Sequence, residues 1–329
     1  MPLSLTVALS RYDRTLAVMD GRVAIEGCDA TFIDLEPEEM FHRALHHEEF
    51  DAAELSFSNY ISLVAEGNSP YIGIPAFTGR KFRHSGIFIN TRSGIEKPED
   101  FKGKIVGAPE YQVTAVTWIR GTFEDDYGVK PSDIRWRWGG LQQAGRKQKV
   151  AFTPPKDVEL EGIPEGNTLQ QMLADGEIDA LISPRAPSCF EEGHPDVARL
   201  FPNYIEVEKD YVRRTGIFPI MHLVAIHRRI VEANPWLPVS LFKALEQAKS
   251  LAYEDCAYNN NPRITNPWIE SYTTEVRQLM GEDYWPYGFE ENRETIETFL
   301  RYHHQHGLSG RQLKAEEIFA ASTLERSRI

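Results

Sequence analysis

The sequence predicts an α/β protein built on a mostly parallel sheet with helices on both sides. Its 329 residues suffice for two lobes or for one large domain. Over roughly the first 182 residues, short apolar runs alternate with amphipathic stretches, which is the pattern of strands and helices in a parallel sheet. After about residue 227 the pattern changes, and helical stretches follow without a confident strand.

Apolar runs bounded by turn residues predict the strands, which follow in chain order: 3–9, 30–35, 51–57, 71–77, 85–90, 104–108, 134–138 and 178–182. Amphipathic spacing predicts the helices. They begin at Pro37 and continue with 58–65, 112–127, 238–258, 267–280 and 290–306. Residues 139–167 are rich in Gly, Pro and charge, so we expect a surface loop or hairpin there.

Composition excludes several classes of protein. A net charge of −13 and a pI near 5.3 argue against a general nucleic-acid or membrane-surface binder, because like charges repel. Cys28, Cys189 and Cys256 are sparse and odd in number, so we expect reduced thiols rather than a disulfide framework. With neither a signal-peptide pattern nor a long apolar run, we expect a cytoplasmic protein.

A cluster of cations in this acidic chain is the first candidate site. Arg80, Lys81, Arg83 and His84 fall within five positions, directly before an apolar run. Strand alternation would orient Arg80 and His84 one way, and Lys81 and Arg83 the other. We therefore expect Arg83 and His84, then Arg80, to contact a small anion, and Lys81 to face solvent. A solvated turn is the alternative interpretation.

Polar residues that follow the early strands form the second candidate site. Asp13 and Arg14 come soon after the first strand; Asp13 either caps a helix or faces a ligand, and Arg14 binds an anion or pairs with a carboxylate. Glu54 lies inside an apolar run, so its carboxylate must be paired or have a raised pKa. The helix that follows offers donors suited to an anion, from Ser56, Ser58 and Asn59.

Further candidates come from later strand ends. Glu110, Tyr111, Gln112 and Thr114 lie at the start of the helix over 112–127, where Glu110 either caps the helix or meets a phenolic hydroxyl or a metal. Arg185 stands between two prolines after the strand over 178–182. His222 lies in an apolar stretch, as a buried neutral imidazole or as a group for acid–base work.

Two segments carry a resemblance to a fold family. "IEKPEDFKGKIVGAPEY" and "LADGEIDA" (173–180) are similar to the second lobe of periplasmic-binding-protein-like folds of type II. The resemblance implies a discontinuous first lobe, 1–91 and 213–329, a second lobe over 92–212, helices at the C-terminal end, and a ligand cleft between the lobes.

A narrower resemblance rests on six segments in order: "SRYDRTLAVMDGRVAIEG", "EEMFHRALHHEEFDAAELSFSNY", "GRKFRHSGIFIN", "GAPEYQVTAVTWIRG", "SPRAP" and "WPYGFEENRETIETFLRYHHQHGL". As a set they resemble the 4,5-dihydroxyphthalate decarboxylase family. The resemblance implies a carboxy-lyase of phthalate breakdown that converts 4,5-dihydroxyphthalate into protocatechuate and CO2, and it suggests a homo-oligomer, a dimer or tetramer. The alternatives are a solute-binding protein for an aromatic carboxylate, and a decarboxylase of another hydroxylated aromatic acid.

That reaction assigns roles to the candidates. Arg14, Arg83 and Arg185 would bind the two carboxylates. His84 or His222 would protonate the ring carbon, and a carboxylate among Glu110, Glu54 and Asp13 would polarise a phenolic hydroxyl. No organic cofactor is expected, and the need for a divalent metal is left open.

Overall fold

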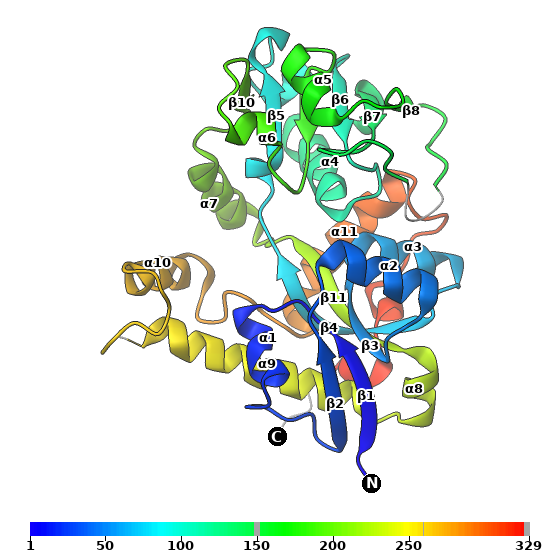
Figure 1. Cartoon of the computed structure of the whole chain (residues 1–329), viewed down its shortest axis with the longest axis vertical. Coiled ribbons are helices and arrows are strands. Elements are labelled where there is room, and N and C mark those ends of the chain that lie inside the picture. Colours follow the sequence, from blue (N-terminus) through cyan, green and yellow to red (C-terminus); the bar gives the residue numbers. More distant parts are fainter. Residues whose placement is uncertain (148–151, 259, 326–329) are drawn as a thin grey trace. The chain divides into compact units, whose positions relative to one another are not determined.

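The computed structural model describes residues 1–147, 152–258 and 260–325, and these fall into two compact units. Unit 1 comprises Met1–Arg80, Ile220–Glu297 and the chain from Leu313 onward, and unit 2 comprises Lys81–Pro219 and Thr298–Gln312. Figure 1 follows the chain through both units in colour. This division gives unit 2 the connections around residues 81–91 and 213–219 and a late segment, 298–312, which the expected boundaries place in the first lobe.

Unit 1 is built on a five-stranded sheet. Its strands lie in the order β2 (Cys28–Ile33), β1 (Leu3–Ala8), β3 (Ala52–Ser56), β11 (Ile220–His227) and β4 (Tyr71–Arg80). β1 is parallel to β2 and β3, whereas β11 is antiparallel to both β3 and β4. The sheet is therefore mostly parallel, as predicted, with one reversed strand contributed by the returning chain.

Unit 1 also contains helices in its described residues, and several of them bury apolar side chains. They are α1 (Asp13–Met19), α2 (Pro37–His47), α3 (Phe57–Glu66), α8 (Arg228–Ala233), α9 (Leu237–Ala257) and α10 (Ile269–Met280). In α2, Met40, Phe41 and Ala44 are buried on one face, because residues three or four apart point the same way. α11 (Arg293–Gln305) begins in unit 1 and ends in unit 2.

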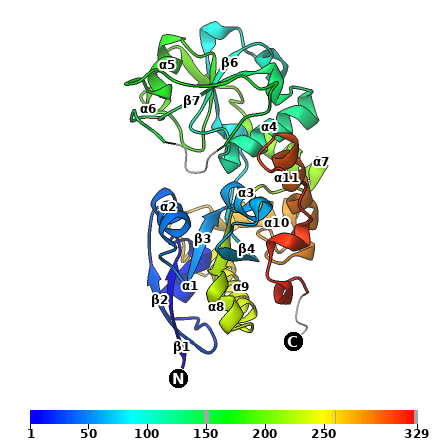
Figure 2. The ribbon, with the colours of Figure 1, turned by 90° about the vertical axis from the view of Figure 1, so that its right-hand side faces the viewer.

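Unit 2 is built on a six-stranded sheet in the order β10 (Val197–Arg199), β5 (Ile87–Asn90), β9 (Ala180–Ile182), β6 (Ile105–Ala108), β7 (Arg135–Trp138) and β8 (Leu160–Gly162). β5 runs antiparallel to both of its neighbours, and β9, β6, β7 and β8 are mutually parallel. Figure 2 shows α4 (Thr114–Tyr127) on one side of this sheet and α5 (Leu169–Asp175) and α6 (Ser188–Glu191) on the other. The remaining helix of unit 2 is α7 (Tyr204–Thr215).

Alternation along the strands explains the two apolar layers of unit 2. On β5, Ile87 and Ile89 pack with α4 in one cluster, and Phe88 packs with α5 in another. On β9, Ile182 joins the first cluster and Leu181 the second. Successive side chains point to opposite faces of a strand, so a nearly continuous apolar run is what a sheet covered on both sides requires.

Three differences from the predicted elements bear on the site. The strand predicted over 85–90 begins at Ile87, because His84–Gly86 form a 3₁₀ turn instead. The strand β11 was not assigned from the sequence, although it occupies the interior of its sheet. The region 139–167 contains the short strand β8 within an otherwise irregular path, and its residues 148–151 lie outside the described ranges.

Of the helices described, none combines the length and hydropathy needed to cross a lipid bilayer.

Candidate functional site

Glu54 is the buried centre of a polar cluster in unit 1. It lies on β3 and has no exposed surface. His222 Nδ1 lies 2.6 Å from Glu54 Oε1, and the hydroxyl of Tyr12 donates to the same oxygen at 3.0 Å. The backbone amide of Ser10 donates to the other oxygen, Oε2, at 3.3 Å. Because a buried carboxylate is costly unless it is hydrogen-bonded, these contacts compensate for the burial of Glu54.

His222 is held through one ring nitrogen, and its side chain remains partly exposed. Its Nδ1 faces Glu54, and its ring makes a T-shaped contact with Phe41, with the ring centroids 4.9 Å apart. The side chain keeps 21% of its surface exposed, whereas the Glu54 side chain has none. The carboxylate favours a proton on Nδ1, which leaves Nε2 to accept a proton or, in the imidazolium, to donate one. This is the arrangement of an acid–base histidine with an orienting partner.

Arg14 provides a rigid cation in the same cluster. Its guanidinium carbon lies 4.1 Å from the centre of the Tyr12 ring and 4.0 Å from that of the Trp285 ring. Its Nε donates to the carbonyl of Thr78 at 2.7 Å, and its Nη1 donates to Asp13 at 3.1 Å. These are the hydrogen bonds of the guanidinium within the described part of the chain. The two hydrogen bonds and the two aromatic rings therefore fix the orientation of the guanidinium.

Tyr12 links the cation to the histidine pair. Its ring stacks on Arg14, and its hydroxyl contacts Glu54. Burial, reinforced by the negative charge of Glu54, raises the pKa of Tyr12 well above its usual range, so the phenol remains a proton donor. Neither Tyr12 nor Trp285 is among the site residues named from the sequence. Tyr12 does fall within the "SRYDRT" segment that drew attention to Asp13 and Arg14.

The remaining candidates of unit 1 surround this cluster or lie apart from it. Asp13 is exposed and pairs with Arg14 at 3.1 Å. Ser56 stands opposite His222 in the β3–β11 register, and Ser58 and Asn59 are buried in the first turn of α3. The structure places Arg80 elsewhere. Its buried guanidinium donates to the carbonyl of Pro286 at 2.8 Å and to the Asn292 side chain, and burial lowers its pKa to about 9.

Arg83 and His84 lie in unit 2, in the connection that precedes β5. His84 is buried against Phe201 and Tyr211, with ring-centre distances of 5.5 and 5.4 Å, and its Nδ1 lies 4.0 Å from Glu208 Oε1. Burial lowers the pKa of His84 to about 4 and that of Arg83 to about 10. Lys81 is exposed. The alternation expected for 80–84 does not hold, because β4 ends at Arg80 and His84 begins a 3₁₀ turn.

His84 yields a prediction about stability and pH. In the unfolded chain an imidazole binds its proton near pH 6.5, whereas folded His84 stays neutral down to about pH 4. Protons therefore favour the unfolded state, and this contribution to stability is lost as the pH falls from about 6.5 to 4, with a loss of about 2 kcal/mol at pH 5. Urea unfolding of wild type and His84→Gln at pH 8 and pH 5 measures it. We expect a smaller pH effect in the variant, and equal pH effects would contradict the prediction.

The predicted residues at the start of α4 form a buried group in unit 2. Glu110 is 1% exposed and pairs with Arg146, Nη2 to Oε1, at 2.7 Å. Gln112 Nε2 donates to Glu110 Oε2 at 3.3 Å. Tyr111 stacks on the fully buried Arg120, whose guanidinium carbon lies 3.6 Å from the ring centre. Thr114 is the first residue of α4 and is buried as well. Glu110 is therefore charge-paired, and a role for it in polarising a phenol stays a prediction.

Arg185 is the last of the predicted cations. It is exposed, in the loop after β9, and its backbone amide donates to the Ser183 hydroxyl at 3.3 Å. In the described ranges no three His, Cys, Asp or Glu side chains come together as a set that could hold a metal ion.

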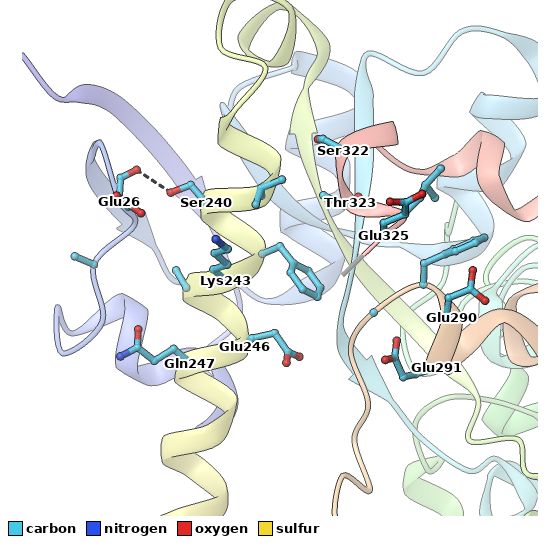
Figure 3. Close-up of a pocket in the computed structure, with 17 residues that line it drawn as sticks. Glu26, Ser240, Lys243, Glu246, Gln247, Glu290, Glu291, Ser322, Thr323 and Glu325 are labelled. Atoms are coloured by element: carbon cyan, nitrogen blue, oxygen red, sulfur yellow. Dashed lines mark hydrogen bonds between the residues drawn. The ribbon is translucent and has the colours of Figure 1, made fainter. Parts of the chain in front are cut away.

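One cavity of unit 1 lies away from this cluster. It measures about 600 Å³ and is lined by α9, by residues 288–291 and by residues 322–325 (Figure 3). Its charged lining is mostly acidic, namely Glu26, Glu246, Glu290, Glu291 and Glu325 beside Lys243. Such a lining repels a dicarboxylate. A smaller cavity of about 240 Å³ in unit 1 includes Arg14 and Trp285 in its wall, and the rest of that wall is mainly apolar and aromatic.

Comparisons with known proteins identify the chain's relatives. No protein-family model matches it. A 4,5-dihydroxyphthalate decarboxylase of Comamonas testosteroni is 43% identical over 327 residues, which is 99% of each chain. A protein of the same name from Pseudomonas putida is 46% identical over 211 residues, which is 64% of this chain and 82% of that protein.

Solved structures share the fold at low sequence identity. The periplasmic aliphatic sulphonate binding protein of Escherichia coli matches with a TM-score of 0.55 at 12% identity, covering 98% of this chain and 99% of that chain. The alkanesulfonate-binding protein of Xanthomonas axonopodis pv. citri matches with a TM-score of 0.53 at 11% identity, covering 98% of both chains. These likenesses confirm the two-lobed periplasmic-binding-protein-like fold. The full-length match to the Comamonas protein establishes more than a fold: the chain belongs to the 4,5-dihydroxyphthalate decarboxylase family.

Proposed function

We propose that this chain is a carboxy-lyase that converts 4,5-dihydroxyphthalate and one proton into protocatechuate and CO2. Family membership supports the reaction class, because both named relatives are decarboxylases of this substrate. The observation that carries the assignment to particular residues is the cluster of Arg14, Tyr12, Glu54 and His222 in unit 1. It joins a stacked cation to a histidine that is oriented by a buried carboxylate.

Decarboxylation of this substrate needs a proton donor to the ring carbon, which these residues can supply. Each carboxylate of the substrate has a ring hydroxyl para to it, and that hydroxyl pushes electrons toward the carbon that will lose CO2. The imidazolium of His222 donates its Nε2 proton to that carbon, forming a C–H bond. The C–C bond to the carboxylate then breaks, and its electron pair restores the aromatic ring as CO2 leaves. Neutral His222 regains a proton from water before the next turnover.

Arg14 binds the carboxylate that is retained. A guanidinium can donate two parallel hydrogen bonds to a carboxylate, and its stacking between two aromatic rings reduces the entropy lost on binding. Glu54 holds the imidazole through Nδ1, so it acts as a positioning residue. Of the two carboxylates predicted in unit 1 to polarise a phenol, Glu54 already makes three hydrogen bonds, whereas Asp13 is exposed beside Arg14. Asp13 is the better candidate of these two.

We also propose that the enzyme needs no organic cofactor, acts in the cytoplasm and assembles as a homo-oligomer. The reaction consumes only a proton, and the electron-rich ring itself stabilises the intermediate. The three cysteines are free thiols, which suits a reducing compartment. Whether the reaction needs a divalent metal is tested by running the turnover assay with EDTA and with added metal ions.

Turnover of the proposed substrate tests the function. The purified full-length chain is mixed with 4,5-dihydroxyphthalate, with EDTA or with added Mg²⁺, Mn²⁺ or Zn²⁺, and CO2 and protocatechuate are followed. We expect equimolar products, and no turnover of unsubstituted phthalate, which lacks the hydroxyls. Binding without turnover in every condition would instead favour a solute-binding protein, the role that the names of the fold neighbours describe for those proteins. Turnover of another hydroxylated aromatic acid alone would change the substrate.

A further inference from the structure

Strand β4 leaves its regular pairing where it passes the site. Val224 of β11 faces Ile74 of β4, but His222 faces Gly79. Residues 75–78 of β4 therefore stand opposite a single residue of β11, Leu223, and the register shifts on both sides of His222. Such bulges free backbone groups from the ladder and change the direction of nearby side chains.

The freed carbonyls of this segment hold two members of the site. The carbonyl of Phe77 accepts a hydrogen bond from Trp285 Nε1 at 2.8 Å. The next carbonyl, of Thr78, accepts one from Arg14 Nε at 2.7 Å. Because Trp285 stacks on Arg14, both side chains of that stack are fixed to consecutive residues of one strand.

The next residue, Gly79, lies directly against the imidazole of His222. A Cβ atom at position 79 would lie 2.5 Å from His222 Nδ1 and 2.7 Å from Cγ. Nδ1 is the atom that contacts Glu54, so a side chain at this position would collide with the imidazole at the atom that its orienting partner holds. The backbone of Gly79 is not left-handed, so its conformation does not require a glycine. The lack of space for a Cβ atom beside His222 explains the glycine at this position.

We propose that Gly79, together with the irregular segment 75–78, is a positioning element of the active site. The two carbonyls fix the cation and the ring stacked on it, and the missing side chain at Gly79 lets His222 reach Glu54. The inference rests on the proposed function for its effect on catalysis. The contact between Gly79 and His222 does not depend on which substrate is used.

Gly79→Ala tests this, with Gly73→Ala as its matched control on the same strand. A Cβ at Gly73 would also be crowded, at 2.7 Å from the carbonyl of Ile318 and from the Leu223 side chain, but it meets no member of the site. Both variants should unfold at lower temperature. Only Gly79→Ala should lower kcat, by about 10- to 100-fold with KM within about threefold, because it misplaces a reacting group.

A spectroscopic readout separates this inference from the proposed function. The imidazole ¹H–¹⁵N signals of His222, assigned by their loss in His222→Gln, should shift in Gly79→Ala and stay unchanged in Gly73→Ala. Unchanged His222 signals or wild-type kcat in folded Gly79→Ala would overturn the positioning role. If wild type turned over no substrate, the proposed function would fail while the imidazole signals still decided the contact.

A second variant guards against a failure to fold. Phe41 makes a T-shaped contact with the His222 ring, so combining Gly79→Ala with Phe41→Leu removes bulk next to the displaced imidazole. We expect this pair of changes to restore stability but not kcat or the wild-type His222 signals, whereas recovery of both would overturn the inference.

Discussion

His222→Gln is expected to lower kcat by about 100- to 10,000-fold and to leave KM within about threefold, because it removes a proton donor that acts only on the reacting carbon. Glutamine approximates the size of the side chain and can still hydrogen-bond to Glu54, but it cannot transfer a proton. Steady-state kinetics on 4,5-dihydroxyphthalate measure the effect. The loss should not be recovered by changing the pH, because no titrating group remains at position 222.

His227 supplies the matched control. It lies on the same strand as His222, is buried, and also pairs with a glutamate, with Nε2 2.9 Å from Glu48 Oε2. Its Nδ1 caps α8 by accepting from the amide of Arg229. His227→Gln should therefore cost about 1 kcal/mol of stability through the cap and leave kcat within about twofold. Equal losses of kcat in the two variants would show that His–Glu pairs in unit 1 are structural, and the acid role of His222 would be wrong.

The sequence could indicate Glu54 and His222 separately but not their pairing. A carboxylate inside an apolar strand needs a partner, and for this reason the sequence indicates Glu54 as a candidate site residue. Its partner lies 168 residues away, brought there by the antiparallel register of β3 and β11. Strand register between distant segments depends on the whole sheet, so no local pattern encodes it. The strand β11 itself was not assigned, although residues 220–226 are apolar apart from His222.

The basic stretch 80–84 shows the opposite limit. Its local charge pattern is conspicuous, but the prediction that its side chains alternate between two faces was wrong, because the strand ends at Arg80. Arg80 and His84 each find buried surroundings within their own units, and the structure does not bring them into the cluster around Glu54. Conversely, Gly79 gave no signal before the structure was known. A glycine that precedes charged residues resembles a turn, and its contact with His222 becomes evident only from the register of β4 and β11.

The second large effect is expected at Arg14. Arg14→Ala should lower kcat/KM by about 30- to 5,000-fold, corresponding to the roughly 2–5 kcal/mol lost when one partner of a desolvated, hydrogen-bonded charge pair is truncated. Most of the loss should appear in KM, because the retained carboxylate is bound equally in the ground state and in the transition state. Initial rates over a wide range of substrate concentration separate the two constants. Arg22→Ala, which removes an exposed arginine of the same unit paired with Asp20, should change neither by more than about twofold.

Arg14→Lys separates the effect of the positive charge at position 14 from that of the planar guanidinium. Lysine keeps the positive charge but loses the planar face between Tyr12 and Trp285 and the hydrogen bond from Nε to Thr78. If the stacked guanidinium matters as the structure indicates, Lys should recover only a small part of the loss seen with Ala. Full recovery would mean that Arg14 acts as a point charge. If Arg14→Ala kept the wild-type KM, the carboxylate would have to be bound by the remaining predicted cations, Arg83 and Arg185. Substrate binding would then not depend on the cluster that holds His222.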